Sequence, residues 1–345
     1  MLHDIAAQVS ACTHASQYAV VTDSQVEPLH GEQVRSALAE SGSTTLISFP
    51  AGEWNKSREC WSTLTDQLLH HGCDRDTVLV ALGGGVTGDL VGFVAATILR
   101  GVDYLFAPTT LTAMVERVVS DETGVDTAFG RDLVGAHHPP CAVVADVHTL
   151  ISLPPVHIAA GVAGALKHGA VADAEYFGRV LEWRDAVRAK DPAVLAKLVR
   201  RSVEIKSAIL AGQIPRHPTP AALGFGRTVA LGLQALLGYE LLHGEALAIG
   251  MIVEATIGER IGVTNPGVAN AMTDAAAAFR LPSELPQGLD IDRLLEAMQG
   301  RGARRDKAVR FALLSRIGSV APASEEDGMF RVPESELRDL LAAVS

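Results

Sequence analysis

The sequence predicts an α/β domain built on a doubly wound parallel sheet, followed by a mainly α-helical domain. Over roughly the first 150 residues, short β-branched runs alternate with segments of helical spacing, as in a sheet covered by helices on both faces. After Leu153, Pro154 and Pro155, long helical patterns dominate instead. A chain of 345 residues, 48% of them hydrophobic, is long and apolar enough for two cores. We therefore expect one domain at residues 1–152 and a second at residues 153–345.

The first domain is expected to alternate strands with helices. The run Thr77–Leu82 is continuously apolar and ends in three glycines, as expected of a central parallel strand buried on both faces. Gly72 closes the helical segment that precedes this strand. Strands are expected at Tyr18–Asp23, Thr44–Phe49, Thr77–Leu82, Tyr104–Thr110 and Ala142–Val147, and helices at Gly31–Ser41, Arg58–Gly72 and Asp89–Leu99.

The second domain is expected to be helical except for two strands, Arg310–Gly318 and Met329–Pro333. Ligands of an open α/β sheet bind at the carboxyl ends of its strands, and a cleft between two domains is the usual ligand site. We therefore expect the site at Gly83–Asp89, at Pro108–Thr110 and at the helices that face them. The helices are expected at Ala159–Ala172, Ala174–Ala189, Pro192–Ala211, Thr228–Leu237, Gly244–Ile261, Pro266–Phe279 and Ile291–Met298.

Composition and charge exclude several classes of partner. The chain has 29 Lys and Arg residues against 40 Asp and Glu residues, a net charge of −11, whereas nucleic acid and anionic lipid require a basic face. The four cysteines form no CxxC pair, which is typical of reduced thiols in an intracellular protein. The N-terminus lacks a signal-peptide pattern, and Glu254 interrupts the longest apolar candidate, Ala246–Gly258. We expect a cytoplasmic protein that binds neither nucleic acid nor a membrane.

A glycine-rich turn is the first chemical motif. Gly83–Asp89 follows a predicted strand and opens a predicted helix. Glycines in this position allow a tight turn and the close approach of a pyrophosphate, while the helix N-terminus supplies N–H groups and a positive dipole end. A second segment, Gly52–Lys56, follows the end of the preceding strand, where it could hold a ribose or a phosphate. The two segments together predict a nucleotide site.

The order and separation of many short motifs resemble the dehydroquinate synthase family of sugar phosphate cyclases. These motifs are GEWNK, GGGVTGDLVGFVAATILRG, PTTL, TGVD, GRDLVGAHHPP, LPP, LKHG, LLHGEALAIGM and DK, and the similarity runs from about Val20 to Gly318. The resemblance implies NAD in an N-terminal Rossmann-like domain and a divalent metal, usually zinc, in a helical domain. It also implies a reaction that transiently oxidises a hydroxyl of a phosphorylated sugar, eliminates phosphate, reduces the ketone again and closes a carbocycle.

Almost all of the family's cofactor-binding positions are matched in this sequence. Asp23 ends the first strand where the family contacts the adenosine, and Glu53 and Lys56 match the family's GExxK pair. Arg131 stands where the family has a lysine beside the nicotinamide and the substrate, so the charge is kept. The cofactor-binding residues expected from the resemblance are Asp23, Glu53, Lys56, Gly84, Gly85, Val86, Asp89, Thr109, Thr110, Arg131, Thr149, Leu150 and Ser152.

The metal half departs from the family pattern. The family's glutamate ligand is replaced by Gly164, three residues before the retained Lys167. Arg227 and Leu231 occupy the positions of the two histidines in the family's GHTxGH motif, and His243 alone is retained among the three ligands. Because one imidazole beside a guanidinium does not make a zinc site, we expect no bound zinc.

The substrate positions depart from the family pattern as well. Glu122 stands for a lysine, Asp132 for an asparagine and Pro220 for an arginine, a change of −4 in charge. Gly224 replaces an asparagine and Glu116 an aspartate. Like charges a few ångströms apart repel by about a few kcal/mol, so a phosphate dianion in the family's pose is disfavoured. Five cations still stand at or beside substrate positions: Arg100, Lys167, Lys206, Arg227 and Lys307.

Three interpretations follow from these substitutions. In the first, the chain is an NAD-dependent enzyme of secondary metabolism with a shifted, metal-independent reaction on a small sugar-derived or cyclitol-like substrate. Arg227 then takes over the electrophilic role of the zinc, with Lys206 or Lys167 as proton carrier, and Glu122 or Asp132 binds an amine or a hydroxyl. Arg131 and His243 complete the candidate catalytic set, and authentic dehydroquinate synthesis is not expected.

The second and third interpretations differ in whether the chain is an enzyme. In one, the chain is a cyclase of secondary metabolism whose metal is held by other ligands, with His137, His138 and His168 as candidates. In the other, it is a non-catalytic NAD-binding paralogue that acts through protein contacts. Family members are usually homodimers in which an arginine matching Arg100 reaches the neighbouring site, so a homodimer is expected.

Overall fold

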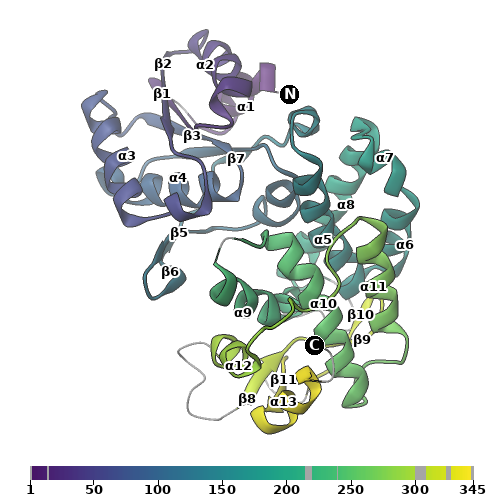
Figure 1. Cartoon of the computed structure of the whole chain (residues 1–345). Coiled ribbons are helices and arrows are strands. Elements are labelled where there is room, and N and C mark those ends of the chain that lie inside the picture. The colour runs from purple at the N-terminus through teal and green to yellow at the C-terminus, as the bar shows by residue number, and fades with distance from the viewer. Residues whose placement is uncertain are drawn as a thin grey trace. The chain divides into compact units, whose positions relative to one another are not determined.

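The computed structural model describes residues 2–13, 15–213, 220–238, 240–299, 308–323 and 328–342 (Figure 1). The chain divides into two compact units, and the division falls between Pro154 and Pro155. The first unit is the α/β domain that the alternating pattern predicts, and the second is mainly helical, so the expected fold class is confirmed.

The first unit is built on a five-stranded parallel sheet in the order β2-β1-β3-β4-β7. Strand β3 lies at its centre and is buried along its whole length, as its unbroken apolar run predicts. The strands are β1 (Gln17–Asp23), β2 (Ser43–Phe49), β3 (Thr77–Gly83), β4 (Tyr104–Pro108) and β7 (Ala142–Val143).

Helices cover both faces of this sheet. On one face, side chains of α3 (Arg58–His70) and α4 (Gly85–Thr97) pack against alternate strand residues such as Leu79 and Phe106. On the other face, α1 (Ile5–Ser10) and α2 (Glu32–Ala39) pack against Val80 and Leu105. Because all five strands are parallel, their carboxyl ends lie at one edge of the sheet, where the turn from β3 to α4 lies.

Two features of the first unit differ from the sequence-based expectation. The expected strand Ala142–Val147 is reduced to β7, because Asp146 accepts a hydrogen bond from the backbone N–H of His148 and starts a short helix, η6 (Val147–Ile151). An antiparallel hairpin, β5 (Glu122–Thr127) and β6 (Gly130–His137), was not expected. Its register shifts after Val125 and every residue of β6 is at least partly exposed, so its sequence lacks an apolar alternation.

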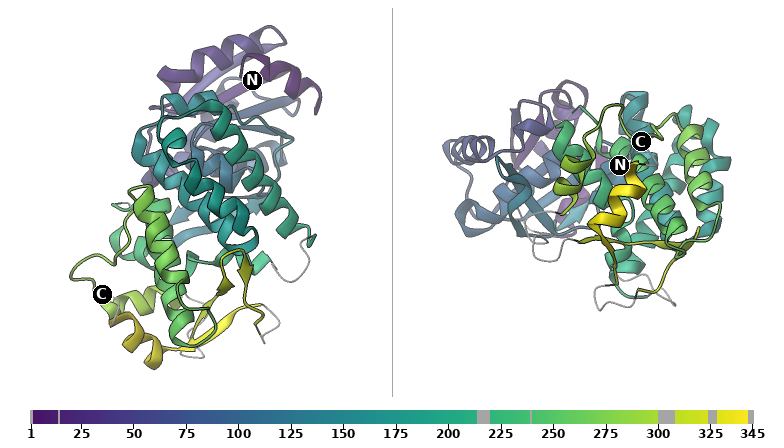
Figure 2. Two further views of the ribbon diagram at one scale, coloured as in Figure 1. Left: turned by 90° about the vertical axis from the view of Figure 1, so that its right-hand side faces the viewer. Right: turned by 60° about the horizontal axis from the view of Figure 1, so that its bottom comes forward.

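The second unit confirms the expected helical domain (Figure 2). Residues of α9, α10, α12, α13 and strand β8 share one core cluster. The Asp173 side chain accepts a hydrogen bond at the start of α6, and Asp191 accepts two at the start of α8. The helices are α5 (Pro155–Ala172), α6 (Ala174–Glu182), α7 (Arg184–Arg188), α8 (Pro192–Leu210), α9 (Arg227–Leu237), α10 (His243–Arg260), α11 (Val268–Ala278), α12 (Ile291–Gln299) and α13 (Glu334–Ala342).

The second unit differs from the sequence-based expectation in three details. The helix expected at Ala174–Ala189 is broken at Trp183 into α6 and α7. The strand expected at Arg310–Gly318 is two strands, β8 (Ala308–Phe311) and β9 (Leu314–Arg316), which pair with β11 (Phe330–Pro333) and β10 (Ser319–Val320) respectively. Helix α13 was not expected.

One helical stretch of the described chain, Pro220–Leu237, has the length and hydropathy of a membrane span. It consists of a short helix, η7 (Pro220–Gly224), and α9, separated by Gly226 in the left-handed conformation (φ 77°). The 11 residues of α9 extend about 16 Å, whereas a bilayer core is about 30 Å thick. Val229 and Leu233 are buried in the core cluster, so α9 is a core helix of this unit.

Candidate functional site

The turn between β3 and α4 has room for a ligand. Gly84 precedes α4 and Gly85 begins it, and a Cβ atom added to Gly85 would meet no other atom within 4 Å. The side-chain hydroxyls of Thr22 and Thr109, at the ends of β1 and β4, are buried and have no hydrogen-bond partner among the described residues. A nucleotide pyrophosphate fits this turn, because it accepts hydrogen bonds from the N–H groups of a helix N-terminus and from hydroxyls, and it needs the space that a glycine leaves.

The other expected cofactor residues at the ends of the strands, in the glycine turn and in η6 lie at the same edge of the sheet. Asp23 accepts hydrogen bonds from the backbone N–H groups of Gln25 (2.9 Å) and Val26 (3.1 Å), which fixes the turn after β1. Ser152 donates to the carbonyl of Thr149 (2.9 Å). Val86 lies at the start of α4, Thr110 follows β4, and Leu150 lies in η6.

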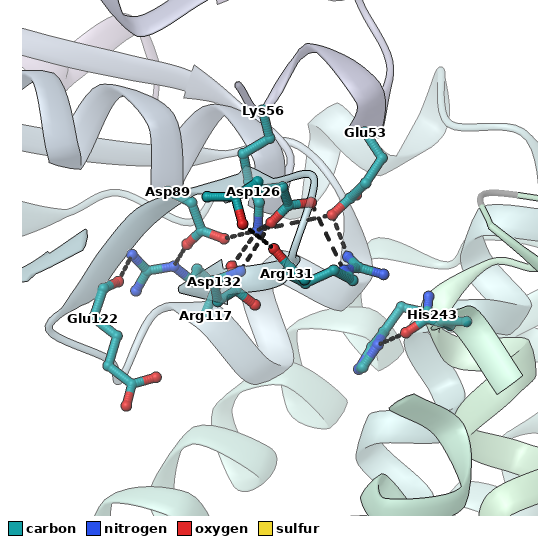
Figure 3. A network of polar contacts seen from close by, with 12 residues as sticks. Glu53, Lys56, Asp89, Arg117, Glu122, Asp126, Arg131, Asp132 and His243 are labelled. Carbon is teal, nitrogen blue, oxygen red and sulfur yellow. Dashed lines mark hydrogen bonds and ion pairs between the residues drawn. The ribbon is translucent and has the colours of Figure 1, made fainter. Parts of the chain in front are cut away.

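A buried lysine gathers four carboxylates beside this turn (Figure 3). The Lys56 side chain is only 2% exposed, so its ammonium depends on these groups for solvation. Burial lowers the pKa of Lys56, but the four carboxylates outweigh that effect and hold the pKa above its ordinary value. The distances from Nζ are 2.5 Å to Asp132, 3.2 Å to Asp89, 3.4 Å to Asp126 and 3.8 Å to Glu53.

Two arginines complete this group, which we call the Lys56 cluster: Glu53, Lys56, Asp89, Arg117, Asp126, Arg131 and Asp132. Arg117 bonds the Asp89 carboxylate and the carbonyls of Ser120 and Glu122. Arg131 pairs with Glu53 and, at 3.9 Å, with Asp126. The cluster thus sets four carboxylates against three cations, and each cation already has carboxylate partners.

The unexpected hairpin builds this cluster. The backbone N–H of Asp126, near the end of β5, donates to the carbonyl of Lys56 (2.7 Å). Asp132, near the start of β6, has a left-handed backbone (φ 53°), and its N–H donates to the Asp126 carboxylate (3.0 Å). The hairpin therefore holds Asp126, Arg131 and Asp132 over the Glu53–Lys56 segment. The Glu122 carboxylate points away from the cluster (Figure 3).

The catalytic candidates of the helical unit lie on four helices. Lys167 on α5 is buried, Lys206 on α8 is half-buried and Arg227, the first residue of α9, is exposed. His243 begins α10, and its Nδ1 lies 3.2 Å from the side-chain oxygen of Gln234 on α9. Helix α10 packs against α5 and α9, and α8 packs against α5.

Glu254 on α10 is a buried ionisable residue that the motifs did not identify as a site residue. Its side chain is fully buried, and its two oxygens accept backbone N–H groups of Gly226 (2.7 Å) and Val229 (3.2 Å). Burial raises the pKa of Glu254 to about 8, although those N–H groups and the Lys167 ammonium act in the opposite direction. Its one sequence signal is a glutamate inside an apolar run.

The donor set at the family's metal positions does not fit a zinc ion. Gly164 has no side chain and the Arg227 guanidinium has no lone pair, so His243 is the single donor of the three. Among the described residues, no group of three or more His, Cys, Asp or Glu side chains is arranged to hold a metal.

The candidate replacement ligands have other partners. The Nδ1 atom of His168 lies 2.7 Å from the hydroxyl of Ser202, and both side chains are buried. His137 lies 3.2 Å from a carboxylate oxygen of Asp121, and His138 lies 2.9 Å from the carbonyl of Val102.

The other candidate substrate residues are Arg100 and Glu116, which are not among the residues of the Lys56 cluster, and Lys307. Arg100 ends a short helix and, like Leu99, has a left-handed backbone (φ 71° and 51°), a conformation that non-glycine residues rarely adopt. Glu116 lies one residue before Arg117 in a single helical turn. Lys307 lies outside the described residues.

Two family models match the chain in sequence. The 3-dehydroquinate synthase N-terminal model covers residues 46–160, and the 3-dehydroquinate synthase C-terminal model covers residues 161–303. A 3-dehydroquinate synthase of Symbiobacterium thermophilum is 41% identical over 305 residues, which is 88% of this chain and 84% of that protein.

Solved structures share the fold over nearly the whole chain. A 2-deoxy-scyllo-inosose synthase complexed with carbaglucose-6-phosphate, NAD+ and Co2+ matches with a TM-score of 0.87 at 22% identity, covering 100% of this chain and 95% of that one. A 2-epi-5-epi-valiolone synthase of Streptomyces hygroscopicus with NAD+ and Zn2+ matches with a TM-score of 0.86 at 26% identity, covering 98% and 92%. The maleylacetate reductase of Agrobacterium tumefaciens, at 17% identity and a TM-score of 0.69, covers 99% and 93% and shares the fold alone.

Proposed function

The chain belongs to the 3-dehydroquinate synthase family, and from that membership we propose an NAD-dependent enzyme of secondary metabolism whose reaction has shifted away from phosphate elimination. Its substrate is a small, polar, sugar-derived or cyclitol-like molecule without a phosphate group, and its reaction does not depend on a metal. We further propose a cytoplasmic homodimer, in which the strained Arg100 reaches the neighbouring site.

Cofactor binding is supported by the open glycine turn and the unpartnered threonine hydroxyls beside it. The 2-deoxy-scyllo-inosose synthase and the 2-epi-5-epi-valiolone synthase with the same fold both hold NAD+. In this chain, the N–H groups at the start of α4 would bind the pyrophosphate, and Thr109 would donate or accept a hydrogen bond that its hydroxyl now lacks. Bound NAD+ would supply the hydride acceptor for oxidation of the carbon that bears a substrate hydroxyl.

One observation supports a substrate without a phosphate group: every cation in the Lys56 cluster is paired with carboxylates. A phosphate dianion binds where cations outnumber carboxylates, but here four carboxylates face three cations. The Asp132 carboxylate is about half exposed (52%), so it can accept a hydrogen bond from a hydroxyl or an ammonium group of the substrate. Glu122, whose carboxylate points out of the cluster, can do the same.

The helical unit supplies the polar groups for chemistry. Arg227 is a permanent cation with five N–H donors, so it can polarise a carbonyl or stabilise an enolate as a metal would. Lys206 or Lys167 carries the proton. The His243 imidazole, whose Nδ1 lies beside the Gln234 amide, can hydrogen-bond to the substrate. Arg131 keeps the positive charge of the family lysine in the first unit.

A second candidate function is a phosphate-eliminating cyclase with non-standard metal ligands. The specific observation in its favour is the 41% identity to a 3-dehydroquinate synthase, and the 2-epi-5-epi-valiolone synthase of the same fold contains zinc. Bound zinc distinguishes the two functions, because the proposed enzyme has none.

The cofactor site is tested by replacing Gly85 with alanine. The added Cβ meets no protein atom, so the fold stays intact, but it occupies the space through which the pyrophosphate approaches the helix N-terminus. We expect isothermal titration with NAD+ to show at least about tenfold weaker binding, or about 1.4 kcal/mol. Gly178→Ala on α6 is the matched control, since its Cβ also meets nothing within 4 Å. Equal affinities of the native chain and the Gly85 variant would refute the site.

A further inference from the structure

Glu254 holds the backbone on both sides of Arg227. Its Oε2 accepts the N–H of Gly226, one residue before Arg227, and its Oε1 accepts the N–H of Val229, two residues after it. The first N–H groups of a helix have no partner within the helix, so a side chain that binds two of them fixes where the helix begins. One carboxyl group thus anchors the first turn of α9 to the middle of α10.

The backbones of α9 and α10 touch at the same point. A Cβ atom on Gly250 would lie 2.0 Å from the carbonyl oxygen of Gly226, and one on Gly226 would lie 2.9 Å from the backbone nitrogen of Met251. Glycine is also the residue that accepts the left-handed backbone of Gly226 (φ 77°) without strain. The start of α9 therefore has little room to shift along α10 while the carboxyl group is in place.

The cost of this arrangement points to a role beyond packing. Glu254 is fully buried, and a buried carboxyl group is unfavourable unless its oxygens are hydrogen-bonded. The Lys167 ammonium of α5, itself a candidate proton carrier, acts electrostatically on Glu254. Glu254 therefore interacts with two of the helices that carry polar groups of the proposed reaction, α5 and α9, but it is too deeply buried to meet a substrate.

We propose that Glu254 is a positioning residue that fixes the Arg227 guanidinium by binding the backbone N–H groups on either side of it. The inference rests on the proposed function, in which Arg227 acts as the electrophile. Glu254 acts through Arg227 and does not itself touch the substrate. A small oxyanion that binds Arg227 should therefore lose affinity when Glu254 loses its acceptor oxygens.

The experiment measures the affinity for oxalate, a planar dianion that a guanidinium binds through two parallel hydrogen bonds. Isothermal titration is carried out on the full chain loaded with NAD+, for the native chain and the variants Arg227→Ala, Glu254→Ala and Glu254→Gln. Hydrogen–deuterium exchange of the first turn of α9 is recorded for the same four proteins. Glu254→Gln keeps the side-chain volume and one acceptor oxygen, which guards against loss of fold in the alanine variant.

We expect Glu254→Ala to weaken oxalate binding by at least about tenfold and to speed exchange of the Gly226 and Val229 amides. Glu254→Gln should recover most of the affinity, because it keeps the shorter bond, to Gly226. If Arg227→Ala weakens oxalate binding and Glu254→Ala does not, the positioning role is refuted and the proposed function stands. If oxalate binds the native chain and Arg227→Ala equally, or binds neither, the electrophilic role of Arg227 is refuted, and the positioning role with it.

Discussion

Replacing Lys56 with methionine should lower the free energy of unfolding of the first unit by about 3–5 kcal/mol. The ammonium is 2% exposed and lies within 4 Å of four carboxylates, so its removal leaves those charges partly buried and facing one another. The same change should abolish measurable NAD+ binding, since the Glu53–Lys56 segment and the hairpin would no longer be held together. Few single substitutions in this chain should cost more.

Urea unfolding measures the stability, and tryptophan fluorescence follows it. Trp54 and Trp61 report the first unit and Trp183 reports the second, so a Trp183→Phe background isolates the relevant transition. Lys197→Met, at an exposed position on α8, is the matched control and should change stability by less than about 0.5 kcal/mol. Adding Asp132→Asn to Lys56→Met should recover part of the loss by removing one of the facing charges. A Lys56 variant as stable as the native chain would show that the cluster does not form.

The second large effect is expected from Arg227→Ala. If Arg227 polarises the reacting carbonyl, its removal should lower turnover by about 10²–10³-fold, the usual cost of losing one oxyanion-stabilising donor. NAD+ affinity should be unchanged, because α9 contributes none of the expected cofactor residues. Turnover is followed as NADH formation with unphosphorylated cyclitols and sugars.

The comparison that decides this prediction is between two exposed arginines of the same unit. Arg200→Ala on α8 removes the same charge from a position outside the proposed site and should leave turnover unchanged. Equal loss in both variants would point to a general effect of charge. Full turnover by Arg227→Ala would remove Arg227 from the mechanism.

The fold was predictable from the sequence where local pattern and burial agree. The run Thr77–Leu82 is apolar at every position after Thr77, and it is the central strand of the sheet. The glycine turn after it was also predictable, because three glycines separate the predicted strand from the predicted helix. The family resemblance stated from short motifs is confirmed by two matching family models and a 41% identical relative.

The contacts of the site were less predictable, because they join residues that lie far apart in the chain. Lys56 meets Asp89 and Asp132, which are 33 and 76 residues away, through a hairpin whose sequence has no clear strand period. Arg117 carried no motif, and its role in the cluster is visible only once the fold brings Asp89 beside it. The interruption of an apolar run by Glu254 was a signal of a buried, hydrogen-bonded carboxyl group, but its partners could not be predicted from the pattern.

The proposed metal-independent reaction is tested most directly by the zinc content of the protein purified from zinc-supplemented medium, measured by elemental mass spectrometry. The double variant Gly164→Glu/Arg227→His is the positive control, because with His243 it restores the three donors that a catalytic zinc requires. We expect far less than one zinc per native chain and about one per chain of the double variant. About one zinc per native chain would refute a metal-independent reaction and favour a metal-dependent cyclase.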